Sequence, residues 1–334
     1  MSNPYWETNF FQFFAVLAQR ILLFIQGKLS FADMCSDEIQ ILVLSLAAIA
    51  FSFLGTFLVL KKMTMVANSL SHTILLGLVI AYLFVTHFVG NGGGLEQTFS
   101  LPVLFLAALL AGVLTTVCTQ LLTQVIKIQE DASIGIVFTT LFALGVVAVT
   151  IFTRNLHLGL EAVTGNVDAL HFDDVKLMFY ITSFDLLIFL LVFPQFVMIS
   201  FDASFAKCIG IKLQFFQYLL MVLVAATVIA SFRAIGVLLV LNFLVGPVLA
   251  ARCFTYRLRK VIAASILIGI LCSLCAVALS RHFVTEYQTP LSTSGLVVLM
   301  VAIAYIIAIV FSPQSRFFIF QRILKNRVAK KQVL

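Results

Sequence analysis

One polar stretch interrupts an apolar segment in the first quarter of the chain. Residues 65–77 read MVANSLSHTILLG, in which Asn68 and His72 are four residues apart. On a helix this spacing places both side chains on one face. An imidazole and an amide oxygen there provide half of a site for a divalent transition metal ion. The alternative is a histidine that only hydrogen-bonds a neighbouring helix. Because polar groups within a membrane are costly and usually line a pathway, we favour the metal site.

Two other apolar segments contain polar side chains. Asn242 lies within AIGVLLVLNFLVGPVLAARC (234–253), ahead of Gly246 and Pro247. Proline removes a backbone donor, so we predict a helix break there, and a broken helix beside a polar residue is how transporters build ion sites. A proline kink with an interhelical hydrogen bond explains the same residues. Asp185 is the only acid within an apolar segment, and either faces a cavity or lies close enough to the surface to be wet.

The segment 200–212, SFDASFAKCIGIK, has the signals of a short capped helix. Asp202 is a good N-cap, and Gly210 is a good residue just beyond the C-cap. A helix of about two turns between them places Phe205 and Ile209 on one face. Such an apolar face is suited to docking onto a partner. The alternative is a helix that rests on the bilayer surface.

The composition predicts the elements that position these residues. Of 334 residues, 62% are hydrophobic and 10% are charged, with a mean hydropathy of +1.14; soluble domains carry about 25% charged residues. The chain is therefore expected to be an all-α, polytopic membrane bundle of eight or nine transmembrane helices. A crossing needs about 20 apolar residues. Nine segments qualify: 39–60, 66–90, 101–123, 133–153, 177–199, 213–232, 234–254, 261–280 and 291–311.

The two ends of the chain differ from this central domain. We divide the chain into an N-terminal extension (1–38), a transmembrane domain (39–312) and a basic cytoplasmic tail (313–334). The apolar segment 10–26 contains Gln12, Gln19 and Arg20, so we interpret it as an amphipathic helix at the interface, or as a poor span.

The distribution of Lys and Arg orients the spans. If all nine segments cross, fifteen of the 21 basic residues lie on one side, including Lys61, Lys62 and the tail, and four lie on the other. The positive side is cytoplasmic. The net charge of +7 is thus a topology signal, and nucleic acid is not needed to explain it.

Several kinds of chemistry lack their motifs. The chain has no P-loop, no H-E-x-x-H and no G-x-S-x-G, so it is not expected to be an enzyme or to hold ATP. Cys272 and Cys275 form a C-x-x-C within an apolar segment and are interpreted as small core residues.

These motifs resemble the permease subunits of bacterial metal-type ABC importers, the manganese, zinc and iron family. The similarity spans about residues 40–312, and the Ser71-His72-x-x-x-x-Gly77 element is its most specific part. Other matching stretches are FLGTFLVLKKMTMVANSLSHTILLGLVIAYL (53–83), DASIGIVFTTLFALGVV (131–147), LEAVTGNVDALHFDDV (160–175) and the region 201–252.

The resemblance implies a function and partners. It implies a multi-pass subunit of the bacterial inner membrane that moves manganese, zinc or iron inward as a transported substrate, with no permanently bound cofactor. It further implies a second permease subunit, a cytoplasmic ATPase that uses ATP, and an extracytoplasmic metal-binding protein. It makes Asp202 to Gly210, with Phe205, Ala206 and Ile209 between them, the helix that couples to the ATPase.

One departure from the family pattern concerns the metal site. The family commonly has Asp four residues before the histidine, where this chain has Asn68. Our hypothesis is that this subunit is the weaker half of a heterodimer; a softer ion, or coordination completed by Asn242 and water, are alternatives.

Two other functions remain as alternatives. A secondary transporter driven by an ion gradient would need several buried carboxylates, and a permease for chelated iron or cobalamin would be expected to have more spans and a wider path. The sequence does not identify the metal or distinguish a homodimer from a heterodimer.

Overall fold

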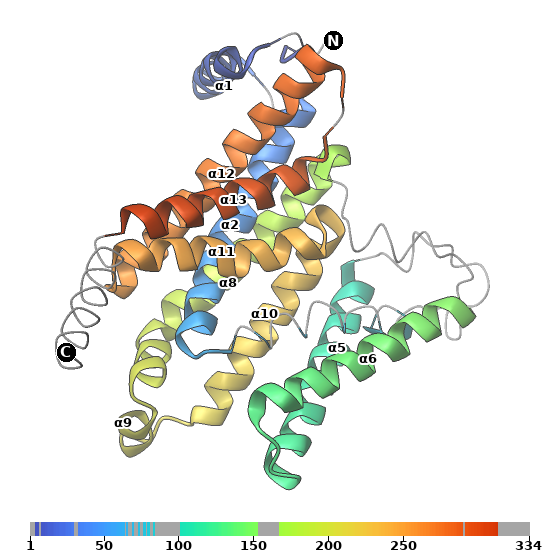
Figure 1. The fold of residues 1–334 in the computed structure, drawn as a ribbon, viewed down its shortest axis with the longest axis vertical. Helices are drawn as coiled ribbons and strands as arrows, with labels where there is room; N and C mark the ends of the chain where they lie inside the picture. The colour runs from blue at the N-terminus through green and yellow to red at the C-terminus, as the bar shows by residue number, and fades with distance from the viewer. Residues whose placement is uncertain are drawn as a thin grey trace, which may run out of the picture.

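The computed structural model describes residues 4–6, 8–29, 33–63, 101–152, 167–289 and 291–312, together with residues 65, 69, 73, 76, 77, 79, 80 and 83. All secondary structure in these residues is helical (Figure 1), which confirms the all-α prediction. The helices are α1 (Phe10–Ile25), α2 (Ser36–Leu60), α5 (Leu101–Gln120), α6 (Glu130–Phe152), α8 (Phe172–Phe201), α9 (Ala203–Cys208), α10 (Leu213–Ile235), α11 (Val237–Phe254), α12 (Leu258–Tyr287) and α13 (Thr293–Phe311).

Six of these helices are long and apolar enough to cross a membrane: α2, α8, α10, α11, α12 and α13. Each overlaps one of the predicted segments. α5 continues into a π-helical turn, Leu121–Val125, and α6 follows it. Most of the predicted segment 66–90, and all of the tail 313–334, lie outside the described residues.

Helix α2 lies at the centre of the bundle and packs against α8, α11 and α12. Small residues allow these close contacts. A Cβ atom on Gly55 would lie 1.9 Å from the carbonyl oxygen of Leu244 in α11, and one on Gly269 in α12 would lie 2.9 Å from the Cβ of Ala48. Small residues let helix backbones approach in membranes, where van der Waals packing drives association.

Aromatic rings fill the space between α2 and α8. The rings of Phe57 in α2 and Phe189 in α8 have centroids 5.3 Å apart, and the ring of Phe189 lies 5.3 Å from that of Phe196, about two turns further along the same face of α8. Phe216 at the start of α10 extends the cluster. Tilted and edge-to-face ring pairs stabilise packing beyond the area they bury. Part of the large phenylalanine content therefore serves the core rather than the lipid surface.

Helix α1 lies across the end of the bundle, near the N-terminus of α2 and the end of α12 (Figure 1). The guanidinium of Arg20 forms an ion pair with Glu38 in the first turn of α2 and also donates to the backbone oxygen of Asp33 at 2.9 Å. The hydroxyl of Tyr5 donates to Glu38 at 2.8 Å. Burial raises the pKa of Tyr5, so the hydroxyl remains a neutral donor.

Candidate translocation and coupling sites

Helix α9 lies at the end of the bundle opposite α1 (Figure 1). The carboxylate of Asp202 accepts the backbone N–H of Phe205 at 2.9 Å. At the other end Gly210 has φ +87°, and the N–H groups of Gly210 and Ile211 return to the carbonyls of Lys207 and Ala206. This pair of hydrogen bonds closes a helix C-terminus. The predicted N-cap and the predicted glycine are both confirmed.

The outer face of α9 is apolar and exposed. Phe205 and Ile209 are each 54% exposed, whereas Ala206 is fully buried. The helix therefore rests on the bundle through a small residue and presents two large apolar side chains away from it. The geometry agrees with the predicted shared face of Phe205 and Ile209.

No linker separates α9 from the long helix before it. Asp202 follows the last residue of α8 and is also the N-cap of α9. α9 contacts α8 and the beginning of α10. α9 is therefore joined to one long helix of the bundle and packed against a second.

Asp185 lies within α8 and is 2% exposed. The hydroxyl of Thr227 in α10 donates to its Oδ2 at 2.6 Å. Its Oδ1 has no hydrogen-bond partner among the described residues. This burial does not support the alternative of a carboxylate kept wet by the outer surface. Asp185 instead lies at the contact between α8 and α10.

Asn242 lies in α11, close to the contact between α11 and α13. Its Oδ1 is 3.0 Å from the point where a Cβ on Gly246 would lie, and that point is 2.6 Å from Val301 of α13. Its Nδ2 is buried and has no partner among the described residues. Because Asp185 faces α10 and this part of α11 faces α13, the structure does not bring the two predicted ligands together.

The helix break that we predict at Gly246 and Pro247 is wrong. α11 continues through both residues from Val237 to Phe254. Proline removes one hydrogen bond, but the remaining bonds and the packed neighbours keep a membrane helix continuous. The discontinuity is at Gly236, where φ is +76° and α10 ends. That conformation favours glycine, so the chain turns from α10 into α11 at Gly236.

Asn68 and His72 lie outside the described residues. Two neighbours of these positions are described. Ser69 and Thr73 are both buried, and the hydroxyl of Thr73 lies 3.0 Å from that of Thr115 in α5. The metal site at Asn68 and His72 stays a prediction. Within the described residues, no three His, Cys, Asp or Glu side chains form a metal-binding group.

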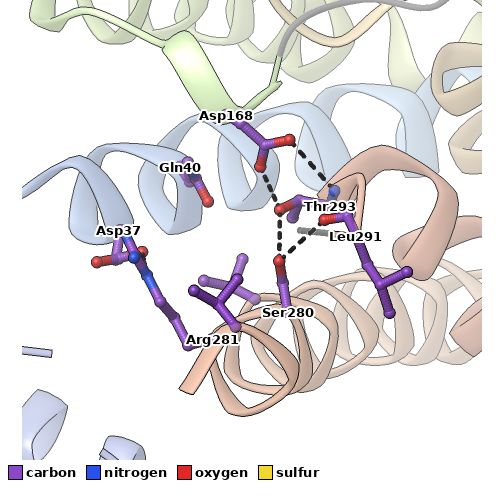
Figure 2. Close-up of a pocket in the computed structure, with 9 residues that line it drawn as sticks. Asp37, Gln40, Asp168, Ser280, Arg281, Leu291 and Thr293 are labelled. Carbon is purple, nitrogen blue, oxygen red and sulfur yellow. Dashed lines mark hydrogen bonds and ion pairs between the residues drawn. The ribbon is translucent and has the colours of Figure 1, made fainter. Parts of the chain in front are cut away.

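A polar cavity at the α1 end was not predicted (Figure 2). It has a volume of about 210 Å³ and lies between the first turns of α2, the end of α12 and the start of α13. Its polar lining consists of Asp37, Gln40, Asp168, Ser280, Arg281 and Thr293. These residues come from distant parts of the chain, so no sequence spacing identifies them. The one available signal was the polar Gln40 at the edge of an apolar run.

Two hydrogen-bonded pairs hold the wall of this cavity. Arg281 donates from Nε to Oδ1 of Asp37 at 2.5 Å. The hydroxyl of Thr293 donates to Oδ1 of Asp168 at 2.5 Å, and the backbone N–H of Thr293 lies 3.5 Å from Oδ2. Ser280 lies beside Thr293 and donates to the carbonyl of Leu291 at 3.2 Å.

Comparison with known proteins gives consistent similarities. Residues 38–312 match the model of the ABC 3 transport family. The chain is 38% identical over 304 residues to a "Probable metal transport system membrane protein" of Chlamydia muridarum, covering 91% of this chain and 93% of that protein. It is 33% identical to the "Manganese transport system membrane protein MntD" of Bacillus subtilis, covering 81% of this chain and 90% of the relative.

A solved structure has the same fold. "PsaBC from Streptococcus pneumoniae in complex with Fab" superposes with a TM-score of 0.71 at 22% identity, covering 90% of this chain and 99% of that chain. At this identity the likeness concerns the fold. The helical permease architecture predicted from the sequence is thereby confirmed.

Proposed function

Because the chain belongs to the ABC 3 transport family, we propose that it is the membrane subunit of an ATP-driven importer for a divalent transition metal ion. The observation that carries this proposal is the family match over residues 38–312, together with the metal and manganese transport systems of its relatives. It is a multi-pass bacterial membrane protein and a transport subunit rather than an enzyme. ATP hydrolysis belongs to a separate subunit.

We propose that α9 is the helix that couples this subunit to the ATPase. Its two exposed apolar side chains, Phe205 and Ile209, can enter a groove on a partner. Its direct connection to α8 and its contact with α10 support the transfer of motion into the bundle.

The proposed path of the ion includes Asn68 and His72, with Asp185 and Asn242 as further polar groups. Asp185 supports this role through the one carboxylate oxygen that has no described partner. A passage site must release its ion, so sparse ligands suit transport better than a closed site. Gly246 and Pro247 next to Asn242 would then act by flexing a continuous helix during gating.

The proposed assembly contains this chain, a second permease subunit, a pair of ATPase subunits and an extracytoplasmic metal-binding protein. The second permease is either another copy or a paralogue; Asn68 favours the paralogue, since a neutral amide lacks the charge that attracts a dication. Manganese is the first metal to test, given the relative from Bacillus subtilis.

The test is metal accumulation in cells that express the whole transporter, measured by elemental mass spectrometry for manganese, iron, zinc and cobalt. We expect one metal to accumulate, and we expect His72→Ala to abolish that accumulation while the protein stays in the membrane. Loss of uptake in a variant of the ATPase that cannot hydrolyse ATP would exclude a gradient-driven transporter. Uptake of a chelate in preference to the free ion would favour the chelate permease.

A further inference from the structure

The polar cavity at the α1 end lies where the Lys and Arg distribution places the extracytoplasmic surface. Figure 2 shows its residues converging from α2, η3 (Val167–Ala169), α12 and α13. Asp168 and Leu291 at its wall are exposed, whereas Asp37 and Gln40 are 1% and 4% exposed. The cavity therefore leads from solvent at its mouth to a buried polar floor.

Gln40 is the residue that packing does not explain. Its side chain points from α2 into the cavity (Figure 2) and makes no hydrogen bond to any described residue. Its amide lines a cavity that water can enter, and it is not one of the fully buried polar groups that lack a partner. Methionine would fill the same volume if this position served packing alone. The amide is therefore placed to meet something that enters the cavity.

The charges of the lining favour a cation. The positive charge of Arg281 is matched by Asp37, to which it is bonded. Asp168 then supplies an uncompensated negative charge, and its neighbours Thr293 and Ser280 contribute hydroxyl oxygens. Carboxylate, amide and hydroxyl oxygens suit hard divalent ions such as Mn²⁺.

The volume fits an ion that keeps its water. The cavity volume of about 210 Å³ leaves room for an ion together with several water molecules. Mg²⁺, a small hard divalent ion, usually keeps several of its waters when a protein binds it. Oxygen atoms spread over the cavity wall can accept hydrogen bonds from the waters of such an ion.

We propose that this cavity is an outer binding site for the hydrated divalent metal ion, in which Asp168 and Gln40 hold the waters of the ion before it enters the membrane path. This site is separate from the predicted ligands Asn68 and His72, and it rests on the proposed import function. It retains the ion at the surface and leaves selection to the deeper polar groups.

The test measures Mn²⁺ binding to the complete purified transporter without nucleotide, by the electron paramagnetic resonance signal of free Mn²⁺. The His72→Ala background removes the predicted membrane site. We expect that in this background Gln40→Met weakens Mn²⁺ binding about tenfold, in line with the effect of losing groups that hold metal-bound waters. We expect Asp168→Asn to weaken it further, because Asn keeps an acceptor for Thr293 but removes the charge.

The control is Gln26→Met, which makes the same chemical change at an exposed position after α1. Because Gln40 has no hydrogen bond to lose, its variant is expected to fold, as size-exclusion chromatography would verify. Unchanged Mn²⁺ binding in both cavity variants overturns the proposal. So does a result in which these variants weaken only the docking of the extracytoplasmic protein, since the cavity would then accept a basic side chain of that partner.

Uptake separates this inference from the proposed function. Normal metal uptake with unchanged Mn²⁺ binding in the cavity variants would remove only the outer site. Absence of metal uptake by the unmodified transporter would remove the import function itself. If the transporter imports the metal and the cavity also binds Mn²⁺, Gln40→Met raises the KM for uptake about tenfold. The maximal rate then stays near that of the unmodified protein.

Discussion

At the scale of single residues, the absence of a side chain matters as much as any polar group. Gly55 allows the backbone of α2 to touch the carbonyl of Leu244 in α11, so an added Cβ has no space. The opposing atom belongs to a backbone, which cannot rotate away as a side chain could. The contact between the central helix and α11 therefore depends on one missing methyl group.

We expect Gly55→Ala to destabilise the protein by about 1–3 kcal/mol through overpacking. Thermal unfolding in detergent, followed by fluorescence, would measure the change. Gly135→Ala in α6 is the matched control, because nothing lies within 4 Å of the added Cβ. That variant should be unchanged, or more stable by up to about 1 kcal/mol. Equal stability of the two variants would contradict the close approach.

Asp185 tests whether a buried acid is structural or functional. Asp185→Asn keeps an oxygen that can accept the hydrogen bond of Thr227 but removes the charge. We expect unchanged amounts of protein in the membrane and at least tenfold slower metal uptake, because a neutral amide attracts a dication far less. Thr227→Val is the control that removes the hydrogen bond and keeps the charge. If Asp185→Asn transports at the normal rate, this residue serves only to join α8 and α10.

At the scale of elements, local signals were sufficient for some helices and insufficient for others. The ends of α9 follow from Asp202 and Gly210, because capping involves atoms within a few residues. The end of α10 depends on Gly236, which resembles any other glycine in an apolar run until its φ of +76° is known. Pro247 is a stronger local indication of a helix end than Gly236 is, yet α11 continues through it because the surrounding helices keep it packed.

The proposed coupling role of α9 gives a prediction for the element as a whole. The double variant Phe205→Ser with Ile209→Ser should fold normally, because both side chains are 54% exposed. We expect metal uptake to fall at least tenfold, since exposed apolar anchors contribute most to docking. Co-purification of the ATPase with this chain measures the loss directly.

Tyr256→Ala is a suitable control for this experiment, because Tyr256 is 70% exposed in the connection between α11 and α12. It changes an exposed aromatic residue on the same predicted side of the membrane without touching α9. Full retention of the ATPase by the double variant would mean that a surface of this chain other than α9 binds the ATPase.

At the scale of the whole molecule, hydropathy predicted the architecture and could not predict the cavity. Long apolar runs identify spans because each must cover the same thickness of lipid. The cavity depends on how the ends of α2, α12 and α13 converge, with Asp37 and Arg281 separated by 244 positions. Only the folded arrangement of helices brings such residues together.

The orientation of the molecule can be tested with a natural cysteine. Cys208 in α9 is exposed and lies on the side that the basic residues predict to be cytoplasmic. In cells that express this chain without the ATPase, a maleimide that does not cross membranes should label Cys208 in inside-out vesicles and not in intact spheroplasts. The Cys208→Ser variant identifies the signal that belongs to this position. Labelling of Cys208 in intact spheroplasts would reverse the topology.

The ion pair between Arg20 and Glu38 determines how far the N-terminus of a recombinant form of this protein can be shortened. The family match begins at residue 38, yet the partners of Glu38 are Tyr5, Arg20 and the backbone N–H of Cys35, all of which precede it. A recombinant chain trimmed to the family limits would keep the carboxylate and discard the groups that neutralise or hydrogen-bond it. The smallest piece suited to purification therefore starts before Tyr5, some thirty residues ahead of where family comparison alone would cut.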